Sequence, residues 1–215
     1  MEDSSQRSSI VWWVSVYLTA PHFQIIICSR GKSIKIHQRT HAARSPIGVF
    51  GFSGARGNVT PCSEANIYGD PHAADLVCKA GWEKTFVGLD VTMQCRFEDS
   101  RLTRLAASTR RECEYLARIS EFYRDFYRST GYSNGFPLHD PTAMAYFIDP
   151  TLFRVQSGPV RVATSGIARG ETILGDSSGR PYAEEHWSEI PPSSACNAVN
   201  SDAVVDLIER LILGY

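Results

Sequence analysis

The sequence lacks the paired cysteines that hold zinc sites and small secreted domains together. None of its six cysteines forms a C-x-x-C pair. Disulfide-stapled folds are usually short chains with too little core, whereas 215 residues with 43% hydrophobic content can bury a core of their own. We therefore expect one globular domain with reduced thiols and a cytoplasmic location.

The chain also lacks an excess of charge of either sign. It has 22 lysines and arginines against 23 aspartates and glutamates, a formal net charge of −1 at pH 7. Proteins that bind nucleic acids present a clustered basic surface. The balance argues against a nucleic-acid polymer as partner and favours a small-molecule substrate.

Long hydrophobic runs are missing as well. The apolar residues 10–20, IVWWVSVYLTA, are interrupted by Pro21 and His22 before the ~20 residues that a membrane-spanning helix needs. The leading MEDSSQR has two acids to one base, unlike the start of a signal peptide. We expect a strand here, with a targeting or membrane signal as the alternative, and no membrane partner. Residues 23–28, FQIIIC, have the length of a buried strand.

What the sequence does contain is a series of helix and strand signals typical of an α/β fold. Residues 29–46 look like a linker, and GVFGF at 48–52 reads as a buried strand. Asp70 as cap, Pro71 at the first helical position and Gly81 as terminator predict a helix between them. KTFVGLDV, residues 84–91, then reads as a buried strand, which favours a largely parallel sheet.

Further elements follow toward the C-terminus. Residues 109–130 predict a long helix with a mostly buried apolar stripe. The stripe consists of Leu116, Ile119, Tyr123, Phe126 and Tyr127. Either Tyr127 or Tyr132 is a candidate to lean over a ligand. PVRVAT, residues 159–164, predicts a strand, and residues 201–213 predict a final helix.

Polar side chains crowd into the segment GNVTPCSEANIYGDP, residues 57–71. Asn58, Glu64 and Asn66 stand within nine positions of one another. One explanation is turn chemistry, because such residues bond their own backbone. The other is a ligand rich in hydroxyl groups, bound beyond the carboxyl ends of the strands.

A second candidate site is the adjacent pair His139 and Asp140. Asp140 can simply cap a helix that has Pro141 at its first position. Alternatively, the histidine titrates near neutral pH and the carboxylate offers a hard oxygen ligand to a divalent cation.

Several segments, taken in order, resemble the inosine/uridine-preferring nucleoside N-ribohydrolases, in their plant-type branch. They are GNVTPCSEANIYGDPHAADLV, FVGLDVT, PLHDPTAMAYFIDPTLF and TSGIARGETI. The resemblance runs from about Gly51 to the C-terminus and implies a Rossmann-like three-layer α/β fold with a mostly parallel sheet. Residues 46–215 would form the hydrolase-like domain, and residues 1–45 match nothing in the family.

The resemblance also implies chemistry: calcium-assisted hydrolysis of the N-glycosidic bond of ribonucleosides to ribose and free base, in nucleoside catabolism and salvage. It implies ribose contacts by Asn58, Glu64 and Asn66. His139 would protonate the leaving base, and Asp140 would be a calcium ligand. The base preference, purine or pyrimidine, stays open.

The sequence departs from the family in one respect. The family's N-terminal signature DxDxGxDD, which supplies most of the calcium ligands and the base that activates water, is absent from these 215 residues. We therefore expect an N-terminally truncated form of the fold, with little or no hydrolase activity in this chain. The alternatives are a noncatalytic ribose-binding or regulatory protein, or a nonfunctional remnant. A homo-oligomer and a pairing with an intact family member both stay open.

Overall fold

The computed structural model describes residues 13–19, 22–28, 45–47, 57–81, 83–176, 182 and 187–215, with side chains from residue 57 onward. The segment GVFGF at 48–52, predicted as a strand, lies outside the described residues. In the first of them, β1 (Trp13–Thr19) and β2 (His22–Cys28) pair antiparallel. Both segments that were predicted as strands are strands, and no helix in the described part of the chain is long and apolar enough to span a membrane.

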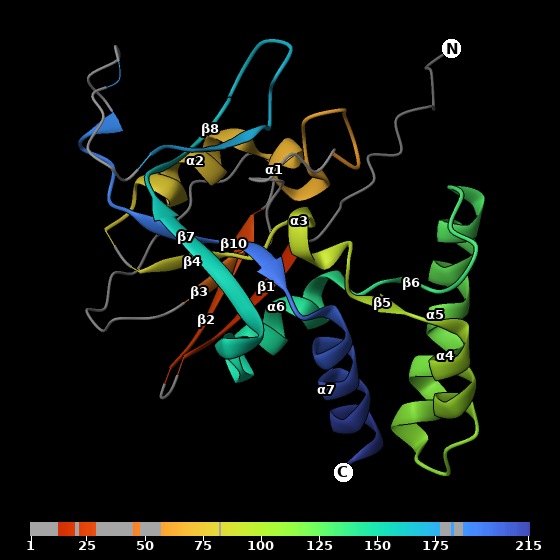
Figure 1. The fold of residues 1–215 in the computed structure, drawn as a ribbon. Coiled ribbons are helices and arrows are strands. Elements are labelled where there is room, and N and C mark those ends of the chain that lie inside the picture. The colour runs from red at the N-terminus through yellow and green to blue at the C-terminus, as the bar shows by residue number, and fades with distance from the viewer. Residues whose placement is uncertain are drawn as a thin grey trace, which may run out of the picture.

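The central sheet of the described residues has four strands, mostly parallel as predicted. Their order is β3 (Ser45–Ile47), β4 (Lys84–Phe86), β10 (Ser193–Val199) and β7 (Phe153–Gly158). β3 runs parallel to β4 and β4 parallel to β10, whereas β7 is an antiparallel edge strand (Figure 1). The boundary drawn between residues 45 and 46 falls inside β3, and that division of the chain stays a prediction.

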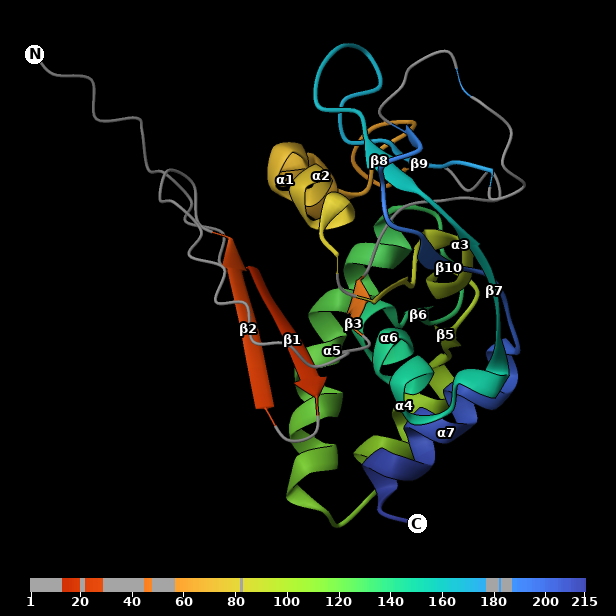
Figure 2. The ribbon, with the colours of Figure 1, turned by 90° about the vertical axis from the view of Figure 1, so that its left-hand side faces the viewer.

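Helices cover both faces of this sheet, which makes three layers (Figures 1 and 2). Neighbouring residues of β10 point to opposite faces, because side chains alternate along a strand. Ala195 belongs to a smaller core, and Cys196 belongs to the larger core. The smaller core includes Ile67 of α1 (Ala65–Gly69), Cys78 of α2 (Pro71–Lys79), and Val160 and Val162 of β8 (Val160–Val162).

The larger core is built by helices on the other face. It takes Leu102 from α4 (Asp99–Ala106), Ala145 from α6 (His139–Ile148) and Val204 from α7 (Ser201–Leu213). Four further short elements are β5 (Arg96–Phe97), β6 (Phe136–Pro137), the 3-10 turn η1 (Pro150–Leu152) and β9 (Thr172–Leu174). The predicted helices at α2 and α7 and the strand at β8 are confirmed.

The prediction of one strand through residues 84–91 was wrong in its extent. The strand ends at Phe86, and Leu89–Thr92 form the short helix α3, which begins after Gly88. Every residue from Lys84 to Thr92 is buried. A continuous apolar run is compatible with either a strand or a buried helical turn, so periodicity alone did not distinguish them.

The long helix α5 (Arg111–Ser129) is confirmed, but the prediction that its stripe is mostly core was wrong. Its buried residues are Cys113, Ala117 and Tyr127. Ile119, Tyr123 and Phe126 are exposed, and Leu116 is half-buried. The helix carries apolar residues on two sides, and the body of the protein covers only one.

Candidate functional site

Asn58 and Glu64 hold the start of α1. Glu64 is its N-cap, and its Oε2 accepts hydrogen bonds from the backbone N–H groups of Asn66 at 2.9 Å and Ile67 at 3.2 Å. The Oδ1 of Asn58 accepts from the backbone N–H of Ala65 at 2.9 Å. Turn chemistry thus accounts for these two side chains, as helix caps satisfy otherwise unpaired donors. The side chain of Asn66 is exposed.

Glu64 is nevertheless an unusual cap because it is almost completely buried, with 6% of its surface exposed. Burial raises the pKa of its carboxyl group, the two backbone hydrogen bonds oppose the rise, and the negative charge of Asp140 adds to it. The carboxylates of Glu64 and Asp140 are therefore within electrostatic range. The fold brings the two predicted site segments together.

His139 is fixed through both nitrogens of its ring. Nδ1 lies 2.9 Å from Oγ1 of Thr92 in α3, and Nε2 lies 2.8 Å from Oη of Tyr127 in α5. Burial lowers the pKa of the imidazole, and the charge of Asp140 partly opposes this. The neutral ring favoured by burial has one donor and one acceptor, which two hydroxyl groups can match.

Two predictions about this junction were wrong. The N-cap of α6 is Leu138, which makes no side-chain cap, so Asp140 is the second helical residue and Pro141 the third. The helix begins earlier because the backbone N–H of Leu138 is held by the carbonyl of Cys95 at 2.8 Å, directly after β6. The side chain of Asp140 is exposed and does not cap the helix.

A tyrosine pair extends the contacts of His139. The Tyr123 hydroxyl donates to Oη of Tyr127 at 3.4 Å, and their rings meet edge-on with centroids 5.0 Å apart. Of the two tyrosines left open by the sequence, Tyr127 is the one bonded to His139. Thr92 and Tyr123 were not predicted as site residues, since no local pattern in the sequence gives them such a role.

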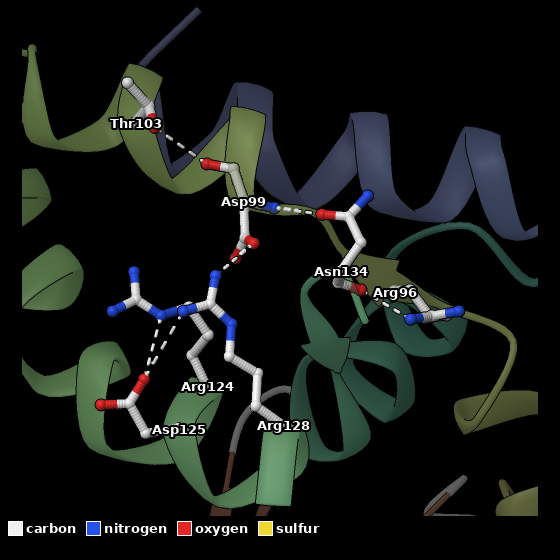
Figure 3. Close-up of polar contacts among 7 residues, drawn as sticks. All are labelled: Arg96, Asp99, Thr103, Arg124, Asp125, Arg128 and Asn134. Carbon is white, nitrogen blue, oxygen red and sulfur yellow. Dashed lines mark hydrogen bonds and ion pairs between the residues drawn. The ribbon is translucent and has the colours of Figure 1, made fainter. Parts of the chain in front are cut away.

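A polar network holds the C-terminal turn of α5, next to Tyr127 (Figure 3). Arg128 Nη2 lies 2.7 Å from Oδ2 of Asp99 at the start of α4. The backbone N–H of Asp99 donates to Oδ1 of Asn134 at 3.1 Å. Asn134 also accepts, at its carbonyl oxygen, from Nη2 of Arg96 at 2.6 Å. The network ties α5, α4 and the loop before β6 into one unit.

The same unit reaches His139 through a chain of aromatic contacts. The guanidinium of Arg96 lies over the Tyr132 ring, 5.0 Å from its centroid. Tyr132 meets Tyr127 edge-on at 5.1 Å, within the usual range for favourable aromatic pairs. The Tyr132 ring thus packs against the Tyr127 ring, and the ion pair of Arg128 with Asp99 fixes the helical turn beside it. Both contacts position the Tyr127 hydroxyl next to His139.

The described residues fit only part of a calcium site. Among them there is no cluster of three or more histidine, cysteine, aspartate or glutamate side chains. Calcium takes six to eight oxygen ligands, of which Asp140 would supply one carboxylate, with Glu64 nearby. The carboxylate set that would complete the site is not among the described residues.

Comparison with known proteins gives a consistent result. Residues 40–206 match the family described as inosine-uridine preferring nucleoside hydrolase. The chain is 35% identical over 159 residues to a probable uridine nucleosidase 1 of Oryza sativa subsp. japonica, covering 74% of this chain and 49% of the relative. It is 40% identical over 158 residues to a probable uridine nucleosidase 2 of Arabidopsis thaliana, covering 73% and 49%.

Solved structures agree. A plant nucleoside hydrolase superimposes with a TM-score of 0.70 at 33% identity, over 75% of this chain and 51% of that one. A purine-preferring ribonucleoside hydrolase from Gardnerella vaginalis gives 0.64 at 30% identity, over 74% and 48%. The chain spans about half the length of the curated relatives it matches.

Proposed function

This chain belongs to the inosine-uridine preferring nucleoside hydrolase family, in its plant-type branch, and we propose that it carries part of the site of a ribonucleoside N-ribohydrolase. The reaction would release ribose and the free base. One observation carries the proposal: His139, held between Thr92 and Tyr127, lies beside Asp140, whose charge reaches the buried Glu64. His139 and Asp140 are neighbours on α6, and the negative charge of Asp140 acts on Glu64 at the start of α1.

His139 suits the task of protonating the leaving base. A base departs poorly as an anion, and a positioned acid typically contributes about 10² to 10⁴ in rate. The two ring hydrogen bonds fix the orientation of the imidazole. Its lowered pKa makes the imidazolium a stronger acid, while Asp140 favours the charged form.

The carboxylates suit the other half of the reaction. Cleavage of a ribosyl C–N bond develops positive charge on the sugar, and negative groups placed beforehand stabilise that charge. Glu64 and Asp140 offer such groups. Asn66 offers an exposed amide to the ribose hydroxyls. In Asn58 the hydrogen bond to Ala65 uses Oδ1, so the amide nitrogen of the same side chain can still donate to a hydroxyl group.

We include calcium in the proposal with Asp140 as one ligand, where the cation would activate the attacking water. The sequence lacks DxDxGxDD, and the described residues hold no complete ligand set. We therefore propose that these 215 residues do not turn over nucleosides by themselves. The assay is release of base from inosine and uridine in excess calcium, and ordinary turnover would contradict the proposal.

A second candidate is a noncatalytic ribose-binding or regulatory protein of the cytoplasm. It is favoured because the predicted ribose contacts Glu64 and Asn66 are present while the calcium ligands are incomplete. Calorimetry with a ribose-mimicking inhibitor tests this second proposal. Binding by this chain supports it, Glu64→Gln should then weaken the binding, and the absence of binding contradicts it.

The base preference is open within both proposals. The curated plant relatives are described as uridine nucleosidases, and the Gardnerella vaginalis structure as purine-preferring. Parallel titrations with uridine and inosine would decide between a pyrimidine and a purine preference.

A further inference from the structure

The loop between β8 and β9, residues 163–171, contains most of the segment TSGIARGETI, and the proposed reaction leaves it without a role. Bonds within the loop give it a defined shape. The backbone N–H of Ala163 donates to the carbonyl of Glu171 at 2.9 Å, and that of Gly170 donates to the carbonyl of Ala163 at 2.7 Å. We call these residues the β8–β9 loop.

The base of the β8–β9 loop is fixed to α2. Nε and Nη2 of Arg161 lie 2.7 Å and 3.1 Å from the two carboxylate oxygens of the buried Asp75. The backbone N–H of Val162 donates to Oδ1 of the same carboxylate at 3.1 Å. Hydrogen bonds between charged groups are among the stronger ones in proteins. The strand that leads into the loop is therefore held against the helix that directly follows α1.

The β8–β9 loop then packs against α1 itself (Figures 1 and 2). The hydroxyl of Ser63, a fully buried residue, donates to the backbone carbonyl of Arg169 at 2.5 Å. The guanidinium of Arg169 lies over the Tyr68 ring, 4.5 Å from its centroid. Ser63 precedes Glu64, the N-cap of α1, and Tyr68 lies within α1. Arg169 thus contacts the chain on both sides of Glu64.

Gly170 allows the loop to approach α1 this closely. Its φ of +87° is in the left-handed region, which glycine adopts without steric cost. A Cβ atom on this residue would lie 3.0 Å from Oγ of Ser63 and 3.0 Å from Cα of Tyr68. Glycine is therefore required here both by the backbone conformation and by the contact with α1.

We propose that the β8–β9 loop positions Glu64 for the ribose, with Ser63, Arg169 and Gly170 as positioning residues. The bond to Ser63 fixes the residue before Glu64, and the ring contact fixes the helix after it. A group that binds a substrate must be held by its surroundings to within about 0.5 Å of its productive position. The inference rests on the proposed ribose contact of Glu64 and names the part of the chain that holds it.

Two glycines of the loop provide a matched test. Gly166 also has a left-handed φ, +74°, but a Cβ atom there would meet no atom of the described residues within 4 Å. Gly170→Ala and Gly166→Ala therefore strain the backbone similarly, and only Gly170→Ala pushes the loop away from α1. NMR hydrogen exchange follows the backbone amides of Asn66 and Ile67, which donate to Glu64. We expect them to exchange about tenfold faster in Gly170→Ala than in Gly166→Ala. Equal rates in the two variants would overturn the proposal.

Substitutions of Arg169 separate positioning from stability. Arg169→Met loses the cation over the Tyr68 ring, whereas Arg169→Lys keeps one. Calorimetry with a ribose-mimicking inhibitor should show binding about threefold weaker for Arg169→Met and nearly restored for Arg169→Lys, at melting temperatures close to that of the wild type. Arg154→Met, which removes an exposed arginine from β7, is the control and should bind as the wild type does.

The two measurements distinguish failure of this inference from failure of the proposed function. A wild-type chain that does not bind the inhibitor would contradict the ribose contact, while the exchange of the Asn66 and Ile67 amides would still decide whether the loop holds the start of α1. A wild-type chain that binds, together with an Arg169→Met variant that binds no more weakly than Arg154→Met, would overturn the positioning role.

Discussion

The hydroxyl oxygen of Tyr127 lies 2.8 Å from Nε2 of His139, although the two residues stand on different helices. The contact joins α5 to α6, and the opposite ring nitrogen joins α6 to α3 through Thr92. Three helices thus converge on one imidazole. The pKa of His139 should therefore depend on how these three helices are packed.

Removing the Tyr127 hydroxyl should change the titration of His139. The Tyr123 hydroxyl donates to Tyr127, and the Tyr127 O–H donates to Nε2 when the proton of the neutral ring is on Nδ1. Donation to the neutral ring favours that form, so Tyr127→Phe should raise the pKa of His139 toward its ordinary value. The free energy of unfolding should fall by about 1 kcal/mol. NMR titration and urea unfolding measure the two effects, with the exposed Tyr115→Phe as control. An unchanged His139 titration would count against the bond.

Stability should depend on pH through His139. Burial lowers the pKa of the folded imidazole, so the unfolded chain binds the proton first as the pH falls. The stabilising contribution is full above about pH 6.5 and declines below it, toward the folded pKa. Urea unfolding from about pH 7.5 to about pH 5.5 should show a smaller loss for His139→Gln than for the wild type. The raised pKa of Glu64 makes its contribution to stability change with pH in the opposite direction. That contribution is present in the wild type and in His139→Gln alike, so it cancels when the two pH dependences are compared. Equal slopes would contradict the assignment.

The ion pair between Asp99 and Arg128 should position Tyr127 more than it stabilises the fold. Both side chains are partly exposed, so the pair contributes roughly 0 to 1 kcal/mol. Asp99→Asn should lower the melting temperature only slightly, yet shift the His139 titration in the same direction as Tyr127→Phe. Asp125→Asn is the control, because Asp125 does not reach α4. Identical titrations for Asp99→Asn and the wild type would limit the pair to a structural role.

Much of the fold was predictable because its signals are local. Asp70 and Pro71 mark the start of α2 within two adjacent residues, and residues 201–213 form α7 as expected. The resemblance assigned site roles to Glu64, His139 and Asp140, which stay predictions, and the charge of Asp140 acts on both Glu64 and His139 in the structure.

The remainder depends on contacts between distant residues. Thr92 reaches His139 because α3 interrupts what reads as a strand, and nothing near Thr92 in the sequence indicates this. Which side of α5 is buried depends on where the neighbouring elements lie, so apolar spacing alone assigned Ile119 and Phe126 to the core incorrectly. Helical periodicity identifies an apolar side and leaves its partner unspecified.

The cysteines should differ in reactivity in the native protein. Burial raises the pKa of Cys78 and of Cys196 to about 12, and that of Cys95 to about 11. The thiolate is the reactive form, so these thiols should resist alkylation. Half-buried Cys62 should react before them. Mass spectrometry after brief iodoacetamide treatment tests the order, with urea-unfolded protein as the control in which all cysteines are labelled.

Calcium should stabilise this chain little. A ligand stabilises a protein only in proportion to its binding to the folded state, and the described residues hold no complete ligand set. We expect the melting temperature to be the same in excess calcium as in chelator. A clear rise in calcium that Asp140→Asn abolishes would instead show that a full site assembles.

The position of β10 has a consequence for how the protein is made. This strand joins β4 on one side to β7 on the other, yet it is formed by residues 193–199, which follow both of those strands in the sequence. On the ribosome, β3, β4 and β7 emerge before the strand that joins β7 to the other two. Until residues 193–199 are made, β4 and β7 each present an unpaired strand edge, which favours aggregation and chaperone binding.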